Sequence, residues 1–131
     1  MIPSLLRSAM RDRPFTIHGD GTQTRDFIHV TDAARALVRS LLLGAEYRGQ
    51  VFNVGSGFAR SINSVVDDVA RFFPHRFEVR HESARPFDIL ASCADTAALR
   101  VALGDKQWMP WEGGLLQTIR QTQRTVSIKA A

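Results

Sequence analysis

Apolar residues recur along the chain with two different periods, which predict helices alternating with short strands. Spacings of three and four residues predict helices over 3–11, 31–43, 62–73, 96–103 and 114–123. Ser61 and Asp95 can cap the third and fourth of these helices, and Phe72 belongs to the apolar face of the third. Alternating or short continuous apolar runs predict strands over 15–18, 25–30, 51–54 and 77–81. Pro14, Gly44 and Gly104 each close one of these elements. This order of elements predicts an α/β fold.

The segment 31–57 predicts a helix followed by a buried strand. Thr31 or Asp32 can cap the helix, and its expected core stripe consists of Ala34, Leu37, Val38, Leu41 and Leu42. The run 51–54 is rich in β-branched residues and bounded by glycine, which is typical of a parallel strand covered on both faces. No repeat, low-complexity stretch or linker interrupts the chain, so we expect one cooperative unit over 1–131.

Composition narrows the possible partners. The 131 residues are 44% hydrophobic, enough for the core of one domain, and carry a net charge of +4. Lys106 and Lys129 are the only lysines, so the excess charge is arginine, whose planar fork suits phosphate or carboxylate. A nucleic-acid binder remains a weaker alternative, because it needs clustered arginines and exposed aromatic residues, and the arginines here are scattered.

The sequence predicts a soluble cytoplasmic protein without a metal. Cys93 is the only cysteine, which excludes an internal disulfide and a cysteine-built metal site, and it fits a reducing compartment. The four histidines lack metal-ligand spacing with acidic residues. No apolar run approaches the roughly 20 residues that a membrane span needs, and the N-terminus lacks a signal-peptide pattern. We therefore expect no membrane partner.

The stretch from Gly19 to Val30 carries the strongest functional signal. Flexible glycines beside Arg25 suit an anionic ligand, and a diphosphate fits the guanidinium best. The local sequence also permits a plainer reading, in which Arg25 only pairs with Asp26 or Asp32 at the surface.

Four segments together resemble a known family, the NAD-dependent epimerase/dehydratase family of extended short-chain dehydrogenases, to which UDP-glucose 4-epimerase belongs. The segments are Ile17-His18-Gly19-Asp20-Gly21-Thr22-Gln23-Thr24-Arg25-Asp26-Phe27-Ile28-His29-Val30-Thr31-Asp32, Phe52-Asn53-Val54-Gly55-Ser56-Gly57, Ala94-Asp95 through Leu103-Gly104, and Glu112-Gly113-Gly114-Leu115 with Thr118-Ile119. They occur in the family's order over residues 2–124. The resemblance implies the C-terminal substrate-binding lobe of such an enzyme (1–30 and 58–126), plus one helix and strand (31–57) of its Rossmann sheet.

The resemblance also implies a ligand, a nucleotide-diphosphate sugar, and the residues that bind it. Arg25 and Arg85 would grip the diphosphate from two sides, and Asp88 would accept hydrogen bonds from the ribose. Thr16 and His18 lie on the strand where relatives hold the base. Asn53 matches an asparagine near the ligand cleft, although it can equally bond local backbone. Phe87 departs from the family pattern, which commonly has glycine at this place.

Two family features are absent from these 131 residues. There is no G-x-x-G-x-x-G loop for NAD, and the single tyrosine, Tyr47, is not part of a Tyr-x-x-x-Lys pair. We therefore expect no catalytic residue and no cofactor-binding residue here, with NAD bound by an N-terminal half that precedes this portion. The alternative is a stand-alone, non-catalytic sugar-nucleotide-binding module or an inactive fragment. A chain without that half would be marginally stable or self-associate, because apolar residues of 31–57 would lose their partners and leave apolar surface and an open strand edge. These residues are Ala34, Leu37, Leu41, Val51, Phe52 and Val54.

Overall fold

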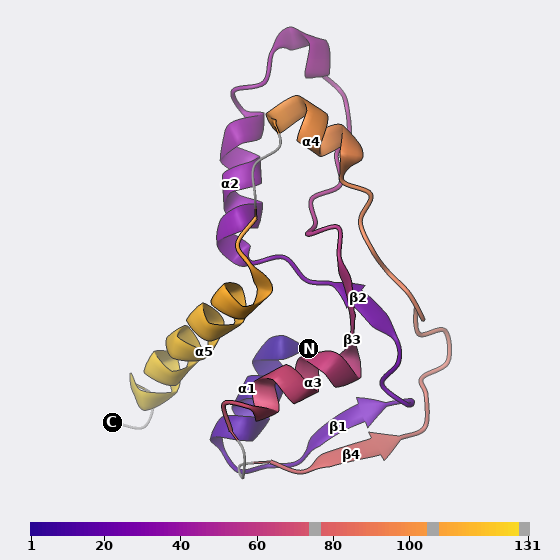
Figure 1. Ribbon diagram of the computed structural model, residues 1–131, viewed down its shortest axis with the longest axis vertical. Helices are drawn as coiled ribbons and strands as arrows, with labels where there is room; N and C mark the ends of the chain where they lie inside the picture. The colour runs from indigo at the N-terminus through magenta and orange to yellow at the C-terminus, as the bar shows by residue number, and fades with distance from the viewer. Residues whose placement is uncertain (74–76, 105–107, 129–131) are drawn as a thin grey trace.

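The computed structural model describes residues 1–73, 77–104 and 108–128. Its helices are α1 (Ile2–Met10), α2 (Val30–Ser40), α3 (Ile62–Ala70), α4 (Ala97–Leu103) and α5 (Trp111–Ile128), with a 3₁₀ turn, η1, at Ala45–Tyr47. Its strands are β1 (Phe15–His18), β2 (Thr24–Asp26), β3 (Ala59–Ser61) and β4 (Val79–Glu82). Helices and strands alternate along the chain, which confirms the predicted α/β class (Figure 1).

The strands pair as two separate two-stranded sheets. β1 and β4 are parallel, with Phe15 opposite Val79, and β2 and β3 are antiparallel, with Arg25 opposite Arg60. The chain after β4 also meets β2, because Thr24 N donates to Leu90 O at 2.8 Å and Ser92 N donates to Thr24 O at 3.1 Å. These contacts bring the segment that follows β4 beside Arg25.

The main hydrophobic core lies in the lower part of Figure 1, where α1, α3 and the β1–β4 pair are gathered and α5 packs on α1. Its buried residues are Leu5, Leu6, Ala9, Phe15, Ile17, Ile62, Val65, Val66, Val69, Phe73, Leu115 and Ile119. Helix α3 supplies four of them with the predicted spacing, and Phe73 follows the helix. The predicted Ser61 cap is confirmed, because the Ser61 hydroxyl accepts from Ser64 N at 3.1 Å. Phe72, predicted to face the core, is instead 46% exposed.

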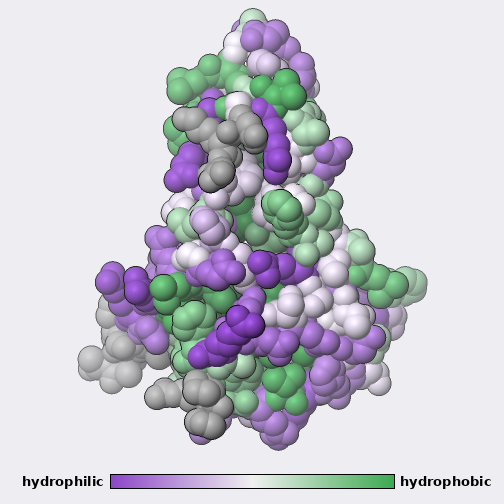
Figure 2. Space-filling model, in the orientation of Figure 1, coloured by the Kyte–Doolittle hydropathy of each residue, from purple (hydrophilic) through white to green (hydrophobic). Residues whose placement is uncertain are grey.

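The upper part contains α2 and α4 and has a much smaller core. Its buried residues are Ala36, Leu99 and Leu103. The apolar stripe of α2 is uncovered, with Leu37 66% exposed and Leu41 82% exposed, as expected for this chain by itself. The helix is amphipathic as predicted, but only its Ala36 side is covered by α4. Figure 2 shows the resulting hydrophobic surface on this upper part of the molecule.

The strand predicted at 51–54 does not form. The segment has no strand assignment, and Val51 is 92% exposed. A strand exists only where a neighbour supplies the hydrogen-bonding ladder. The described residues supply no such neighbour, so most of this apolar run lies at the surface, and Phe52 alone of its residues packs half-buried against the small upper core.

Two predicted helix caps differ in detail. The strand predicted over 25–30 ends at Asp26, and His29 caps α2 instead of Thr31 or Asp32, since its Nδ1 accepts from Thr31 N at 3.3 Å. Asp95 is predicted as the N-cap residue of α4, but the N-cap residue is Thr96. The Asp95 carboxylate, one residue before the N-cap, still accepts from Ala97 N at 3.0 Å.

The Asp26 carboxylate joins three segments that are distant in sequence. It accepts from Ser56 N and Gly57 N, both at 2.9 Å, from the Ser56 hydroxyl, and from Ala94 N at 3.2 Å. Burial alone would raise the pKa of Asp26, but these hydrogen bonds outweigh it and hold the pKa below its ordinary value. The ionised form of Asp26 is therefore the one that the fold stabilises.

A second carboxylate, Asp32, holds α2 against the residues that precede α5. Its side chain is 1% exposed and accepts from Arg35 Nη1 at 2.8 Å and from Met109 N at 2.7 Å. Both acceptor oxygens are thus used, which satisfies the rule that a buried charge must be paired and hydrogen-bonded.

We expect Asp26→Asn to destabilise the chain by about 2 kcal/mol at neutral pH, because a neutral amide with one acceptor oxygen cannot satisfy four donors. The depressed pKa of Asp26 means that its contribution is complete above the unfolded value of 3.8 and is lost as the pH falls through the folded value. Chemical denaturation at several pH values measures both effects. The natural chain should lose stability below about pH 4 more steeply than Asp26→Asn, and the exposed Asp67→Asn is the matched control.

Candidate functional site

One crevice of about 680 Å³ is lined by five of the six residues predicted to bind substrate: Thr16, His18, Arg25, Arg85 and Asp88. β1 forms one wall, with buried Phe15 and Ile17 alternating with half-buried Thr16 and His18. Alternate residues of a strand face opposite sides, so the two polar side chains face away from the core. Arg25 comes from β2, and Arg85 and Asp88 come from the chain after β4. The expected convergence of Arg25 and Arg85 on one crevice is confirmed.

Arg25 is held in place from two directions. Its Nη1 donates to Thr24 O at 2.8 Å, and its Nη2 pairs with Asp88 Oδ1 at 2.8 Å. The local alternative, a pair with Asp26 or Asp32, is wrong because those carboxylates bind the loop amides and Arg35. The Arg25 side chain is 28% exposed and that of Asp88 is 35% exposed, so solvent and ligands have access to the pair.

Arg85 meets His18 across the same crevice. Arg85 Nη2 lies 2.8 Å from His18 Nε2, and since a guanidinium can only donate, Nε2 is the acceptor. The ring proton is then on Nδ1, which faces Glu82 Oε2 at 3.8 Å. Among the described residues, the Arg and Asp side chains lining the crevice are two guanidiniums and one carboxylate. The net positive charge favours an anionic ligand.

The turn that carries Arg85 and Asp88 has an unusual residue at its tip. Asp88 N donates to Arg85 O at 3.3 Å, and Phe87 has φ +64°. Proline at the second position and positive φ at the third are the pattern of a type II turn, which favours glycine at that third position. The left-handed region costs a non-glycine residue about 1–2 kcal/mol. The Phe87 side chain is fully exposed, with a relative exposure of 102%, so no packing within the chain offsets this cost.

The sixth predicted residue, Asn53, does not line the crevice. Its Nδ2 donates to Asp95 O at 3.3 Å, a bond to backbone 42 positions away and not to the local backbone that the alternative named. Gln23 does line the crevice and was not singled out: its Nε2 donates to His18 O at 2.8 Å and so supports the β1 wall. Its place two residues before Arg25, in the segment that carries the resemblance, is the sequence signal that could have identified it.

The glycine turn at 55–57 is unsuited to a dinucleotide phosphate. An anion at such a turn needs free backbone amides, and here Ser56 N and Gly57 N already donate to Asp26. Any side chain at position 55 would also collide, since a Cβ there would lie 2.5 Å from Asp26 Oδ2 and from Ala94 Cβ.

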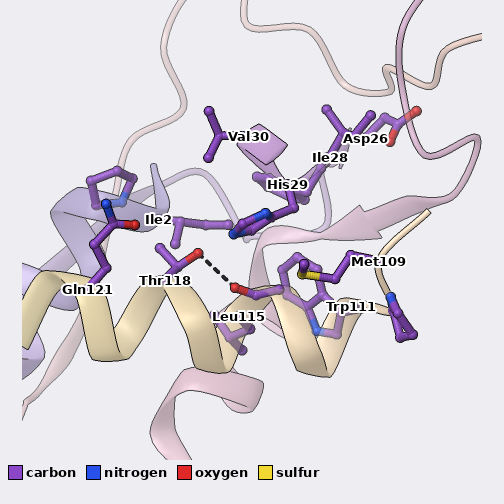
Figure 3. A pocket seen from close by; sticks show the side chains of 14 residues that line it. Ile2, Asp26, Ile28, His29, Val30, Met109, Trp111, Leu115, Thr118 and Gln121 are labelled. Carbon is purple, nitrogen blue, oxygen red and sulfur yellow. Dashed lines mark hydrogen bonds between the residues drawn. The ribbon is translucent and has the colours of Figure 1, made fainter. Parts of the chain in front are cut away.

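A second cavity, of about 380 Å³, lies between the start of α2 and α5. Figure 3 shows the His29 ring in the middle of it, above α5, with Ile2 and Trp111 on either side. Gly114 lies against the ring, since a Cβ there would be in van der Waals contact with His29 Cδ2 at 3.4 Å. Thr118 does not offer its hydroxyl proton, since Oγ1 donates to Gly114 O at 2.8 Å. The lining is mostly apolar and does not suit a diphosphate.

The described residues also bear on membranes and metals. Over the described ranges, no helix combines the length and the apolar character that crossing a membrane requires. Among the same residues, no three His, Cys, Asp or Glu side chains gather where they could hold a metal ion.

Comparison with known proteins points to one family. The model of the NAD dependent epimerase/dehydratase family matches residues 1–55. A trifunctional UDP-glucose 4,6-dehydratase/UDP-4-keto-6-deoxy-D-glucose 3,5-epimerase/UDP-4-keto-L-rhamnose-reductase of Arabidopsis thaliana is 31% identical over 121 residues, which cover 91% of this chain and 18% of the plant enzyme.

Solved structures agree with this assignment over nearly the whole chain. MoeE5 in complex with UDP-glucuronic acid and NAD has a TM-score of 0.86 and 37% identity, covering 95% of this chain and 41% of MoeE5. The epimerase Mth375 of Methanothermobacter thermautotrophicus has a TM-score of 0.89 at 24% identity, covering 97% of this chain and 38% of its own, and shows the fold alone. The chain thus spans well under half the length of these proteins, and over that span it is similar to members of the NAD-dependent epimerase/dehydratase family.

Proposed function

We propose that this chain recognises a nucleotide-diphosphate sugar, as the C-terminal part of an NAD-dependent sugar-nucleotide epimerase or dehydratase similar to UDP-glucose 4-epimerase. The observation that carries the proposal is the pair of guanidiniums, Arg25 and Arg85, in one crevice of about 680 Å³. Planar guanidiniums bind phosphate oxygens with two parallel hydrogen bonds. Two such groups on separate segments match two linked phosphates.

The ligand would lie along the crevice in a defined order. We place the diphosphate between Arg25 and Arg85, the ribose at Asp88, and the base along β1 near Thr16 and His18. The complexes of MoeE5 with UDP-glucuronic acid and with UDP-glucose support this ligand class, since their sequence identities to this chain are 37% and 36%. Asn53 remains a weaker candidate, because its amide already bonds Asp95 O.

Binding would exchange partners within the crevice. A phosphate accepts from the Arg25 Nη2 that now pairs with Asp88, and a ribose hydroxyl donates to the Asp88 carboxylate that is released. The released carboxylate thus finds a donor on the ligand itself. A ligand with phosphate but no ribose leaves Asp88 without this partner and should bind less tightly.

The chemistry would reside in residues outside this sequence. The 131 residues contain neither a Tyr-x-x-x-Lys pair nor an NAD loop, so we assign NAD and the catalytic groups to the rest of the parent enzyme. Its reaction class stays open among epimerisation, dehydration, decarboxylation and reduction. We place the protein in the cytoplasm, in polysaccharide biosynthesis, because sugar nucleotides are the proposed substrates.

The uncovered apolar surface would contact that remainder. This surface consists of the exposed residues Leu37, Val38, Leu41 and Val51. The mostly apolar cavity at His29 is also accessible to solvent. Single exposed apolar residues are normal on a protein surface, whereas several that lie together mark an interaction site. We propose that residues 31–57 join a Rossmann sheet of the parent enzyme, and that the chain by itself associates with copies of itself.

The alternative is a stand-alone module that binds sugar nucleotides without oxidising them. Reading the DNA upstream of the first codon separates the two. An in-frame G-x-x-G-x-x-G loop and Tyr-x-x-x-Lys pair support the enzyme, and a ribosome-binding site directly before Met1 supports the module.

We expect Arg25→Ala to weaken binding of UDP-sugars about tenfold to a hundredfold, because a charge-assisted hydrogen bond to phosphate is lost. Calorimetric titration with UDP-, dTDP- and GDP-sugars measures this loss. Arg25→Lys should recover only part of it, since an ammonium cannot bind bidentately. Arg71→Ala on exposed α3 surface is the matched control, and equal affinity of Arg25→Ala and the natural chain would rule out the phosphate contact.

We expect the natural chain to sediment as oligomers at micromolar concentration and Leu37→Gln/Leu41→Gln to shift it toward monomer. Both leucines are exposed and lie one helical turn apart, so the double change removes a continuous apolar face. Sedimentation velocity measures the shift, and Arg7→Gln on exposed α1 surface controls for an unspecific effect. A natural chain that is monomeric and unfolds in one sharp transition at dilute concentration would contradict the role given to this surface.

A further inference from the structure

The side chain of Phe87 has no role in the packing of this chain. Its side chain is fully exposed, so it contributes nothing to the core, and its backbone is in the left-handed region at φ +64°. Among the described residues only Asp12 is also a non-glycine residue with positive φ, and aspartate tolerates that region better than an aromatic residue does. Glycine would satisfy this turn better, so the fold alone does not account for the aromatic ring.

The turn is fixed to the crevice on both sides of Phe87. Arg85 bonds His18 across 67 positions of sequence, and Asp88 pairs with Arg25 across 63 positions. Both are crevice-lining residues, and the turn is closed by Asp88 N donating to Arg85 O at 3.3 Å. The residues on both sides of Pro86 and Phe87 therefore line the crevice, while the Phe87 ring is exposed to solvent and does not itself line the crevice in the free chain.

We propose that Phe87 is a ligand-binding residue of this site, whose ring stacks on the base of a nucleoside diphosphate bound with its phosphates at Arg25 and Arg85. The inference rests on the proposed function, because it needs a nucleotide in this crevice. Phe87 directly precedes Asp88, which is assigned to the ribose, so the ring is next to the nucleoside end of the ligand. An aromatic face stacks on any base, and ring and rim together would cover the base from the solvent side.

Three variants separate the ring from the backbone. Phe87→Asn removes the ring and keeps a residue that tolerates positive φ, Phe87→Tyr keeps an aromatic ring, and Leu90→Asn is the matched control, since Leu90 is an exposed apolar residue of the same segment, 79% exposed. Each variant of the 131-residue chain is titrated calorimetrically with UDP and with inorganic pyrophosphate, which has the phosphates without the base. Thermal unfolding checks that Phe87→Asn is at least as stable as the natural chain.

We expect Phe87→Asn to bind UDP about tenfold more weakly than the natural chain, the size of one base–aromatic stack. Its affinity for pyrophosphate should be unchanged, and Phe87→Tyr and Leu90→Asn should bind UDP normally. The ring signals of Phe87, identified in the NMR spectrum by their loss in Phe87→Asn, should move upfield with UDP and stay in place with pyrophosphate.

Two results would overturn the stacking role while leaving the proposed function intact. The first is equal UDP affinity of Phe87→Asn and the natural chain. The second is an equal loss for UDP and pyrophosphate, which would show that the substitution only disturbs the turn that carries Arg85 and Asp88. A natural chain that binds none of UDP, dTDP and GDP would instead overturn the proposed function, and the stacking role with it.

Discussion

The arrangement of this chain depends on the ionised carboxylate of Asp26. β2 has only three residues, yet it pairs with β3, meets the chain at 90–92, and uses Asp26 to bind the amides of Ser56, Gly57 and Ala94. Arg25 is the neighbour of Asp26 on this strand, and successive residues of a strand project to opposite sides. Fixing Asp26 on the loop side therefore holds Arg25 on the crevice side. The cost of partly burying one charge is offset by hydrogen bonds that also position the functional guanidinium.

Local features of the fold followed from the sequence, and features that need a distant partner did not. The Ser61 cap, the α3 spacing and the alternation of β1 depend on residues a few positions apart, and each was predicted. The run 51–54 and the stripe of α2 have the apolar pattern of buried elements, but burial needs a covering surface, and the described residues bury only Ala36, Leu99 and Leu103 in that region. The site shows the same limit. Its residues came from a resemblance, whereas the pairs Arg25–Asp88 and Arg85–His18 join positions more than 60 apart that no spacing rule connects.

The two parts of the chain differ in how much apolar surface they bury. The lower core joins twelve buried residues from α1, β1, α3 and α5, while the upper cluster has three. Segments with few buried contacts open at lower free energy than the core does. The upper part should therefore exchange its amide protons first, while the crevice, whose β1 wall belongs to the lower core, keeps its shape. Recognition is thus built on the more stable part of the molecule.

The pairing of Arg25 with Asp88 affects how ionic strength acts on this crevice. A lone guanidinium gains an ion pair when a phosphate arrives, so added salt opposes binding strongly. Here the phosphate displaces a carboxylate that is already 2.8 Å away, and one ion pair replaces another. Screening weakens the free and the bound arrangement alike. Affinity at Arg25 should consequently change less with salt than two exposed arginines would suggest, and the uncharged contacts of the nucleoside should decide which ligand is retained.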